Sequence, residues 1–295
     1  MRLLIITQKV AKNDPILGFF HQWLEEFAKN FEKVTVICLE EGEHNLPGIK
    51  VLSLGKEKNV SKFKYLINFY RYIWQERGNY DAVFVHMNQE YVLLAGDIWK
   101  FLGKKIYLWR NHAKGNFWTT MAVWLSNKVF YTSPRSFTAR FKKAVQMPVG
   151  IDTDFFKPDP AVSRVPNSAL FLGRISPVKK VLEFIDWVKD NNYDATIAGP
   201  ILAEDKLYGE KVKAVLTDKI KFIGPVSQEE AKRLYQTHEI YANFTPAGSF
   251  DKTIFEAAAC GAKLFVKNPD IKNFNPETNS LKTLMRKIKE EISLN

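Results

Sequence analysis

Residues 171–180 read FLGRISPVKK, and this stretch carries most of the information about the fold. An apolar run ends at Gly173, a turn with Pro177 follows, and a helical pattern begins near Val178. A buried strand that ends in glycine and passes through a short loop into a helix is typical of a parallel α/β sheet. The stretch therefore predicts one strand–loop–helix unit of such a sheet.

The same alternation of short apolar runs and helical patterns continues through the second half of the chain. The strands predicted there span residues 168–173, 194–199, 219–224, 239–244 and 263–266. The helices predicted there lie near residues 178–190, 203–216, 228–236 and 253–260. The first three strands end at Gly173, Gly199 and Gly224, where glycine lets a backbone or ligand come close.

The first half of the chain repeats this pattern, with short and almost continuously apolar strands that are typical of a sheet buried on both faces. Strands are predicted over residues 2–7, 34–39, 49–54, 81–86, 105–109, 128–132 and 144–148. Helices are predicted over residues 18–30, 61–77, 89–102, 117–126 and 134–142.

Two separate runs of this alternation predict an α/β protein with two Rossmann-like, doubly wound parallel-sheet domains that face each other across a cleft. We expect an N-terminal domain over 1–149 and a C-terminal domain over 150–280. An amphipathic helix in 281–295 is expected to pack across the two domains. Such a cleft suits a reaction between two substrates.

Composition narrows the classes of function. The chain has 295 residues, 25% of them charged, two cysteines far apart in apolar runs, and no apolar run long enough to span a bilayer. A cytoplasmic protein is expected.

The charge is unevenly distributed along the chain. Residues 1–150 contain 22 basic and 12 acidic residues, whereas 151–295 contain 21 basic and 20 acidic residues. The basic half favours an anionic partner such as a membrane surface or a phosphorylated acceptor, and the alternative is a lysine-biased soluble surface. No nucleic-acid-binding module is recognised, so nucleic acid is not expected as a partner.

The loop after Gly173 is the strongest candidate site. Arg174 and Lys179 lie at the start of a predicted helix, where cations oppose the helix dipole. A bound diphosphate explains their position, since arginine binds phosphate in bidentate fashion and free helix N–H groups add to it. The alternative is two solvated cations on a loop.

A second candidate site is the turn-rich loop and small-residue helix over 244–261. Gly248 and Ser249 can present backbone N–H groups to an anion. Glu256 is a lone carboxylate in an alanine-rich helix, which is costly unless it is hydrogen-bonded or paired. The vicinal hydroxyls of a ribose are suitable donors to it. The alternatives are a structural ion pair or a cap for a neighbouring helix.

These segments resemble family 4 of the glycosyltransferases, the retaining enzymes of the GT-B fold. Residues 148–152, PVGID, resemble the family's NGVD link, and Gly173-Arg174 through Lys179 resembles GR…P.KG. Residues 221–235 resemble V.F.G.V…L..LY, and residues 256–261, EAAACG, resemble EAMACG. The four motifs follow one another in the family's order, whereas the first half matches more loosely.

The resemblance implies that the N-terminal domain over 1–149 binds the acceptor and that the C-terminal domain over 150–280 binds a nucleotide sugar. It also implies which residues act. Arg174 and Lys179 would bind the donor diphosphate, Glu256 the ribose, and His112 would orient the sugar, so these four form the implied catalytic set. The donor-binding residues implied are Gly173, Arg174, Lys179, Gly248, Ser249, Phe250, Asp251, Lys252, Thr253 and Glu256. Gly18 and His86 resemble cleft residues on the acceptor side, together with His112.

The implied reaction is retaining transfer of a hexose from a nucleotide-diphosphate sugar to a glycan or a lipid-linked acceptor, as in the synthesis of cell-surface polysaccharides. No cofactor or metal is expected, and Asp152-Thr153-Asp154 is interpreted as part of the interdomain link. Gly248 stands where the family has the first glutamate of its motif, and Ser249 or Asp251 is a candidate substitute. The alternatives are a catalytically silent GT-B binding protein and a nucleotide-sugar 2-epimerase of the same fold.

Aromatic amphipathic helices beside basic residues favour an anionic membrane interface, which predicts peripheral association with the inner face of the cell membrane. One such helix carries Phe63, Leu66, Ile67, Phe69, Tyr70, Ile73 and Trp74, and another spans residues 117–125. The alternative is that these side chains pack on the sheet.

Overall fold

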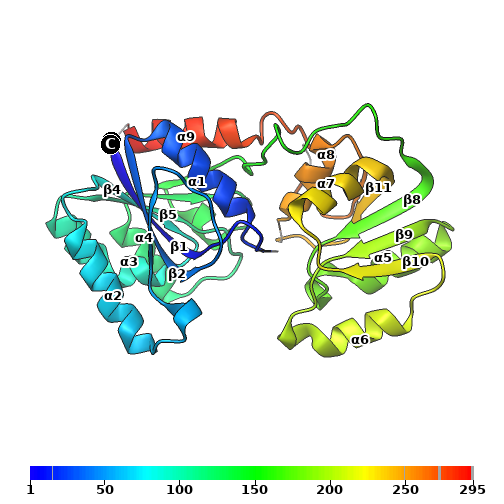
Figure 1. Cartoon of the computed structure of the whole chain (residues 1–295), viewed down its shortest axis with the longest axis horizontal. Coiled ribbons are helices and arrows are strands. Elements are labelled where there is room, and N and C mark those ends of the chain that lie inside the picture. Colours follow the sequence, from blue (N-terminus) through cyan, green and yellow to red (C-terminus); the bar gives the residue numbers. More distant parts are fainter. Residues whose placement is uncertain (15, 249, 272–273, 294–295) are drawn as a thin grey trace. The chain divides into compact units, whose positions relative to one another are not determined.

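The computed structural model of the chain describes residues 1–14, 16–248, 250–271 and 274–293. The chain divides into two compact units. Unit 1 comprises Met1–Met147 and Leu284–Asn295, and unit 2 comprises Pro148–Thr283. Each unit is a parallel sheet covered by helices on both faces (Figure 1).

Unit 1 is built on a seven-stranded sheet with the order β3-β2-β1-β4-β5-β6-β7. Its strands are β1 (Arg2–Val10), β2 (Lys33–Glu41), β3 (Lys50–Ser53), β4 (Ala82–His86), β5 (Lys105–Trp109), β6 (Lys128–Tyr131) and β7 (Ala144–Gln146). Each neighbouring pair is parallel. All five residues of β4 are buried, as expected for a central strand with helices on both sides.

Helices cover both faces of this sheet. They are α1 (Phe19–Asn30), α2 (Lys62–Gln75), α3 (Glu90–Phe101), α4 (Phe117–Leu125) and α9 (Leu281–Ser293). Val83 and Val85 share one core cluster with residues of α2, α3 and α4, whereas the Phe84 ring packs on Phe27 of α1. Because side chains alternate along a strand, α2, α3 and α4 lie on one face and α1 on the other. On α9, the carbonyl of Ile292 accepts a hydrogen bond from the Tyr107 hydroxyl at 3.2 Å.

The helix predicted over 134–142 is wrong: only a short 3-10 helix, η2 (Phe137–Arg140), forms there. Polar side chains hold the rest of the segment in turns. The hydroxyls of Ser136 and Thr138 donate to the carbonyl of Arg110, and the Asn111 side chain accepts from the backbone N–H of Ser133. These side chains compete with helical hydrogen bonds, as serine, threonine and asparagine commonly do.

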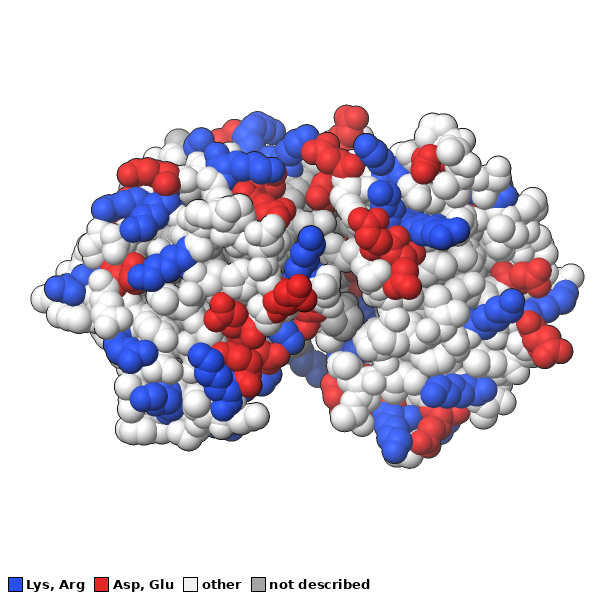
Figure 2. Space-filling model, viewed as in Figure 1, with Lys and Arg blue, Asp and Glu red and all other residues white. Residues whose placement is uncertain are grey.

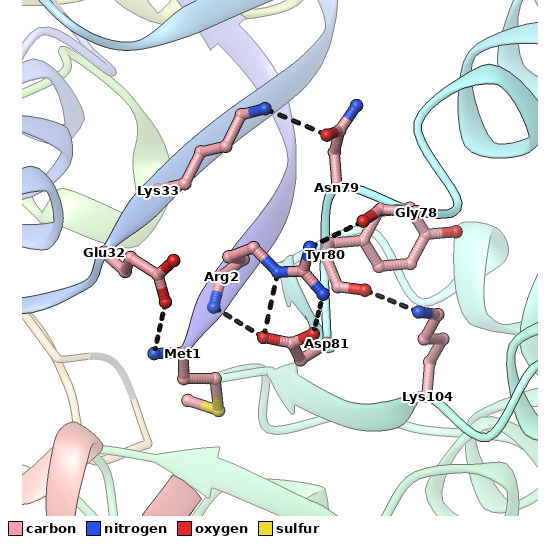
Figure 3. A network of polar contacts seen from close by, with 9 residues as sticks. All are labelled: Met1, Arg2, Glu32, Lys33, Gly78, Asn79, Tyr80, Asp81 and Lys104. Carbon is pink, nitrogen blue, oxygen red and sulfur yellow. Dashed lines mark hydrogen bonds and ion pairs between the residues drawn. The ribbon is translucent and has the colours of Figure 1, made fainter.

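A polar network fixes the amino end of β1 next to β4 (Figure 3). The Arg2 guanidinium donates to Asp81 Oδ1 at 2.5 Å and to Asp81 Oδ2 at 3.3 Å, and the Arg2 backbone N–H donates to Oδ2 at 2.8 Å. The same guanidinium reaches the carbonyl of Gly78 at 2.7 Å. The hydrogen bond from Arg2 holds the pKa of Asp81 down at about 2, so the pair contributes stability while Asp81 is ionised.

We expect Asp81→Asn to lower the free energy of unfolding, and the loss to depend on pH. Because the pKa of Asp81 is depressed from 3.8 in the folded state, its stabilisation is complete above pH 3.8 and disappears as the pH falls toward 2. Denaturant unfolding at a series of pH values should show the difference between wild type and variant shrinking over this range. Glu32→Gln is the control, since Glu32 makes an exposed ion pair with the N-terminal amine at the same edge and should have little effect. A constant difference down to pH 2 would contradict the role of Asp81.

Unit 2 contains a five-stranded parallel sheet with the order β10-β9-β8-β11-β12. Its strands are β8 (Val165–Leu172), β9 (Asp194–Ala198), β10 (Ile220–Gly224), β11 (His238–Asn243) and β12 (Lys263–Val266). Its helices are α5 (Val181–Asp190), α6 (Lys206–Ala214), α7 (Gln228–Thr237) and α8 (Lys252–Ala259). One core cluster joins the sheet to α5 and α6, and a second joins it to α7 and α8, so each face carries one pair of helices.

The start of α5 differs from the prediction. Residues Pro177–Lys179 form a separate 3-10 turn, η3, and α5 begins only at Val181. Lys180 lies between them in the left-handed conformation, with φ of 54°. Glycine adopts this conformation without steric cost. This explains why the motif GR…P.KG, which this segment resembles, has glycine at the position of Lys180.

Candidate functional site

The order of the strands in unit 2 reverses between β8 and β11. From β8 the sheet continues to β9 and β10 on one side, whereas β11 and β12 lie on the other. Ligands of open parallel sheets bind beyond the carboxyl ends of the strands at such a reversal, because the two loops there diverge and leave a crevice. The loops over 173–180 and 244–251 both begin at this point.

Glycines allow the backbone to pack closely along this edge of the sheet. The N–H of Gly199 donates to the carbonyl of Gly224 at 2.7 Å, and Gly199 itself has φ of 141°. A Cβ atom at Gly199 would overlap the carbonyl oxygen of Gly173. The close approach of the backbone after β8 therefore requires glycine at position 199, which the sequence predicted only as a general feature of strand ends.

Lys179 and Asp251 form an ion pair across the reversal point. Lys179 comes from η3 after β8, and Asp251 precedes α8 after β11, so the two residues are 72 positions apart in the sequence. Only 18% of the Lys179 side chain and 11% of the Asp251 side chain are exposed. Shielding from water strengthens such a pair, so each residue fixes the position of the other.

The second oxygen of Asp251 is also bound. Asp251 Oδ2 accepts hydrogen bonds from the Thr245 hydroxyl at 2.6 Å and from the Asn243 side-chain amide at 3.0 Å. Burial pushes the pKa of Asp251 up, but the Lys179 cation and these two donors outweigh it, and the pKa is lowered. Asp251 is thus an ionised carboxylate held by three partners.

Arg174 lies in the same loop as Lys179 but has different partners. Its Nη1 is 3.8 Å from Glu204 and its Nε is 3.6 Å from Asp205, both in the 3-10 turn η4 (Ala203–Asp205). These distances are too long for hydrogen bonds, and 39% of the Arg174 side chain is exposed. The guanidinium is therefore accessible and can bind another anion.

Glu256 lies one turn into α8 and is held by Tyr235 of α7. The buried Tyr235 hydroxyl donates to Glu256 Oε2 at 3.1 Å. Burial raises the pKa of Glu256, and the nearby Lys252, one turn earlier on α8, partly opposes this effect. Burial likewise lowers the pKa of Lys252. The site therefore contains two ionisable groups whose charged forms are both disfavoured by desolvation.

The other residues proposed to bind the donor surround the start of α8. Thr253 accepts a hydrogen bond from the Tyr241 hydroxyl at 2.7 Å, and the Phe250 ring stacks on Phe255 with 5.5 Å between centroids. The backbone N–H of Gly248 donates to a carboxylate oxygen of Asp270 at 2.6 Å. The predicted residue Ser249 lies outside the described residues.

Unit 1 has its own reversal point between β1 and β4, and two predicted cleft residues lie near it. Gly18 precedes α1, where a Cβ would come within 2.5 Å of the carbonyl of Asp14, so the turn requires glycine. His86 ends β4 and lies 3.2 Å from the Thr7 hydroxyl through Nδ1. The His86 ring is 2% exposed and stacks on Phe20 with centroids 4.0 Å apart, so most of its surface is used in packing.

His112 lies in the loop after β5, at the carboxyl edge of the sheet of unit 1. Its ring is exposed, and Nδ1 accepts a hydrogen bond from the backbone N–H of Lys114 at 3.0 Å. This contact fixes the orientation of the ring and directs Nε2 away from it.

The Asp152-Thr153-Asp154 segment has structural contacts. Asp152 Oδ1 accepts from the backbone N–H groups of Asp154 and Phe155, both at 3.1 Å, and Asp154 pairs with Lys282 at 2.6 Å. Within residues 1–14, 16–248, 250–271 and 274–293, no three or more His, Cys, Asp or Glu side chains are grouped closely enough to hold a metal ion.

Several contacts of the site were missed by sequence reasoning. Thr245 and Asn243, which bind Asp251, belong to no sequence motif that links them to Lys179. Tyr235 was quoted only as part of a motif, although its hydroxyl holds Glu256. The position of Leu234-Tyr235 near the end of the helix predicted over 228–236 is the signal that could have pointed to it.

Comparison with known proteins agrees with this arrangement. Residues 179–290 match the family model described as Glycosyl transferase-like, a match that includes Lys179, Asp251 and Glu256. A comparison with curated protein sequences gives no match. Across the described residues, no helix has the length and apolar character needed to cross a membrane.

Solved structures resemble the chain over its whole length. A glycosyltransferase from Rickettsia africae ESF-5 has a TM-score of 0.67 at 15% identity, covering 99% of this chain and 88% of that one. Sucrose-phosphate synthase from Thermosynechococcus elongatus has a TM-score of 0.67 at 12% identity, covering 100% and 94%. UDP-GlcNAc 2-epimerase from Methanocaldococcus jannaschii has a TM-score of 0.52 at 14% identity, covering 98% and 92%.

These likenesses, together with the two parallel sheets, show that the chain has the GT-B fold predicted from its sequence. The family-model match and the glycosyltransferase neighbours support a glycosyltransferase in general terms.

Proposed function

We propose that the chain is a retaining, metal-independent hexosyltransferase of glycosyltransferase family 4. It takes a sugar from a nucleotide-diphosphate donor and transfers it to a glycan or lipid-linked acceptor at an anionic membrane surface. The observation that carries the proposal is the position of Lys179, a mostly buried cation at the β8–β11 reversal point, within the segment that matches the glycosyltransferase-like model.

The donor diphosphate would bind between Lys179 and Arg174. Arg174 can form bidentate hydrogen bonds with a phosphate because its long contacts with Glu204 and Asp205 leave its donors accessible. Lys179 would share its charge between Asp251 and the diphosphate. Asp251 thus holds Lys179 in place for the phosphate, and Gly173 allows the phosphate to approach the backbone.

Glu256 would bind the hydroxyls of the donor ribose through the oxygen that Tyr235 does not occupy. Phe250, Lys252 and Thr253 at the start of α8 would line the donor site, and His112 would orient the sugar from unit 1. Gly248 leaves no carboxylate at its own position, so Asp251 is the carboxylate nearest the start of α8 on that loop.

The chemical step would break the bond between the anomeric carbon and the diphosphate oxygen, and form a bond from that carbon to the acceptor oxygen on the same face. The acceptor proton would pass to the departing diphosphate, so no side-chain nucleophile is needed. The charge that develops on the leaving group is stabilised by Lys179 and Arg174, and fixed charges of this kind supply roughly 3–4 kcal/mol each in a water-excluded site.

The test is a transfer assay with UDP-, GDP- and ADP-sugars, each with a panel of glycan and lipid-linked acceptors, followed by product analysis. The proposal predicts one donor class that yields a glycosylated acceptor with the donor's anomeric configuration and one nucleoside diphosphate per transfer. An epimerised sugar without transfer would favour the 2-epimerase alternative, and binding of a donor without any product would favour a silent binding protein. An inverted product, or a requirement for added metal, would contradict the retaining or metal-independent part of the proposal.

A further inference from the structure

The helix α2 has an apolar stripe on its solvent-facing side. Phe63, Leu66, Ile67, Tyr70 and Trp74 are all exposed, with exposed fractions from 37% for Tyr70 to 72% for Phe63. Their spacing of three, four, seven and eleven residues from Phe63 places them on one side of the helix. Other residues of the same helix, Phe69 and Ile73 among them, fill the core. Leu66 and Ile73 are seven residues apart and lie side by side, so α2 has one wide apolar arc, with one edge in the core and the other exposed.

Basic residues border this stripe. Lys62, Lys64 and Arg71 are exposed on α2, and no acidic residue occurs between Lys62 and Gln75. Lys64 and Arg71 are seven residues apart and so follow one edge of the stripe. Contact with a second surface would remove these apolar side chains from water, which is favourable. The cations at the edge of the stripe favour a partner surface that is negatively charged.

The helices α3 and α4, which pack on the same face of the sheet as α2, carry exposed apolar side chains as well. Leu94 and Phe101 lie on α3, and Phe117, Trp118 and Trp124 lie on α4, with exposed fractions from 37% for Leu94 to 88% for Phe101. Among the described residues, every exposed phenylalanine, tyrosine and tryptophan side chain is on α2, α3 or α4. We call the exposed apolar residues of these three helices the outer aromatic face.

The three helices form one continuous layer. The Tyr70 hydroxyl donates to the carbonyl of Leu94 at 3.0 Å and joins α2 to α3. At Gly96 of α3 a Cβ would lie 3.1 Å from the side chain of Leu125, so α3 and α4 pack closely. The exposed aromatic residues of separate helices thus lie on one layer of the same domain.

On the three helices Lys62, Lys64, Arg71 and Lys100 outnumber the acidic residues Glu90 and Asp97 of α3, so the layer is positive on balance. Between Asp97 and Asp152 the chain contains ten lysine or arginine residues and no acidic residue. Lys143 donates to the carbonyls of Trp124 and Ser126 and so lies at the carboxyl end of α4. In Figure 2 the flank of unit 1 that carries α2 in Figure 1 shows more Lys and Arg than acidic side chains, and a larger acidic group lies nearer the middle of the view.

We propose that the outer aromatic face docks unit 1 on an anionic lipid bilayer. Tryptophan and tyrosine favour the boundary between headgroups and acyl chains, and lysine and arginine at the edges pair with anionic headgroups. An amphipathic helix with aromatic residues on one side and cations beside them is suited to lie in the plane of the interface. The inference rests on the membrane partner in the proposed function, but it depends on residues far in sequence from the donor site.

The test is co-flotation of the full chain with vesicles, without nucleotide sugar. One preparation contains phosphatidylcholine alone and the other equal parts of phosphatidylcholine and phosphatidylglycerol. The protein is expected to float only with the anionic vesicles, and brominated acyl chains are expected to quench its tryptophan fluorescence. Binding should weaken as salt is added, because the electrostatic part is screened.

Two variants separate the apolar and charged contributions. The triple variant Phe63→Ser/Ile67→Ser/Trp74→Ser and the double variant Lys64→Glu/Arg71→Glu are each expected to weaken vesicle binding on the order of tenfold or more. Matched controls on α6 are Leu207→Ser, at a side chain 77% exposed, and Lys211→Glu/Lys213→Glu. The controls should float like wild type, and circular dichroism should show that all variants remain folded.

Three outcomes would overturn the inference. The chain could fail to float with either vesicle, float equally with both, or form a dimer in sedimentation that the triple variant dissociates without any vesicle binding. Transfer to a soluble acceptor, measured in parallel without vesicles, distinguishes this failure from failure of the proposed reaction. Normal transfer with no flotation would refute the docking face alone.

Discussion

Replacing Lys179 with alanine is expected to lower kcat/KM for glycosyl transfer by about 10²–10³-fold, because a preorganised charge on the leaving diphosphate contributes on that scale. The same substitution leaves Asp251 as an unpaired and mostly buried carboxylate, which lowers the free energy of unfolding by up to about 3 kcal/mol. The two effects must be measured separately, with steady-state kinetics for the first and denaturant unfolding for the second.

A second substitution separates the two effects. In Lys179→Ala/Asp251→Asn the buried charge is removed, so most of the lost stability should return while transfer stays low. Lys180→Ala is the matched control, since the Lys180 side chain pairs with the exposed Glu183 and its removal should leave transfer unchanged. Near-normal transfer by the double variant would show that Lys179 does not bind the diphosphate.

Gly199→Ala is expected to destabilise unit 2 by at least about 3 kcal/mol, because alanine is strained at positive φ and its Cβ overlaps the carbonyl of Gly173. The overlap involves backbone on both sides, so no flexible side chain can move away. Thermal unfolding should show a clear fall in Tm, or the variant should fail to fold.

Gly78→Ala provides the comparison for this substitution. Gly78 has ordinary φ, and a Cβ there meets nothing within 4 Å, so the variant should unfold close to wild type. Equal stability of Gly199→Ala and wild type would contradict the close backbone approach at the ends of β8 and β9.

The sequence pattern predicted the two sheets well because buried parallel strands are continuous apolar runs, and every predicted strand is present. It failed over 134–142, where hydroxyl and amide side chains form hydrogen bonds with the backbone and stabilise turns in place of a helix. It also placed the start of α5 too early. Lys180 adopts the left-handed conformation there, and a lysine in the sequence does not indicate such a break.

The site was predictable in part. Lys179 and Glu256 were recognisable from local motifs. The pairing of Lys179 with Asp251 was not, since a contact across 72 positions depends on which strands are neighbours in the sheet. Similarly, apolar residues cover a wide arc of α2, so periodicity could not show which part of the arc would face the sheet. The structure assigns Phe69 and Ile73 to the core and leaves Phe63 and Trp74 exposed.

The central claim is that unit 2 binds a nucleoside diphosphate at the carboxyl ends of β8 and β11. A crystal structure of the chain soaked with UDP, GDP or ADP tests it most directly. The account predicts the diphosphate within hydrogen-bonding distance of Lys179 and Arg174, with the ribose hydroxyls on Glu256. A nucleotide bound elsewhere, or a diphosphate that contacts neither cation, would contradict it.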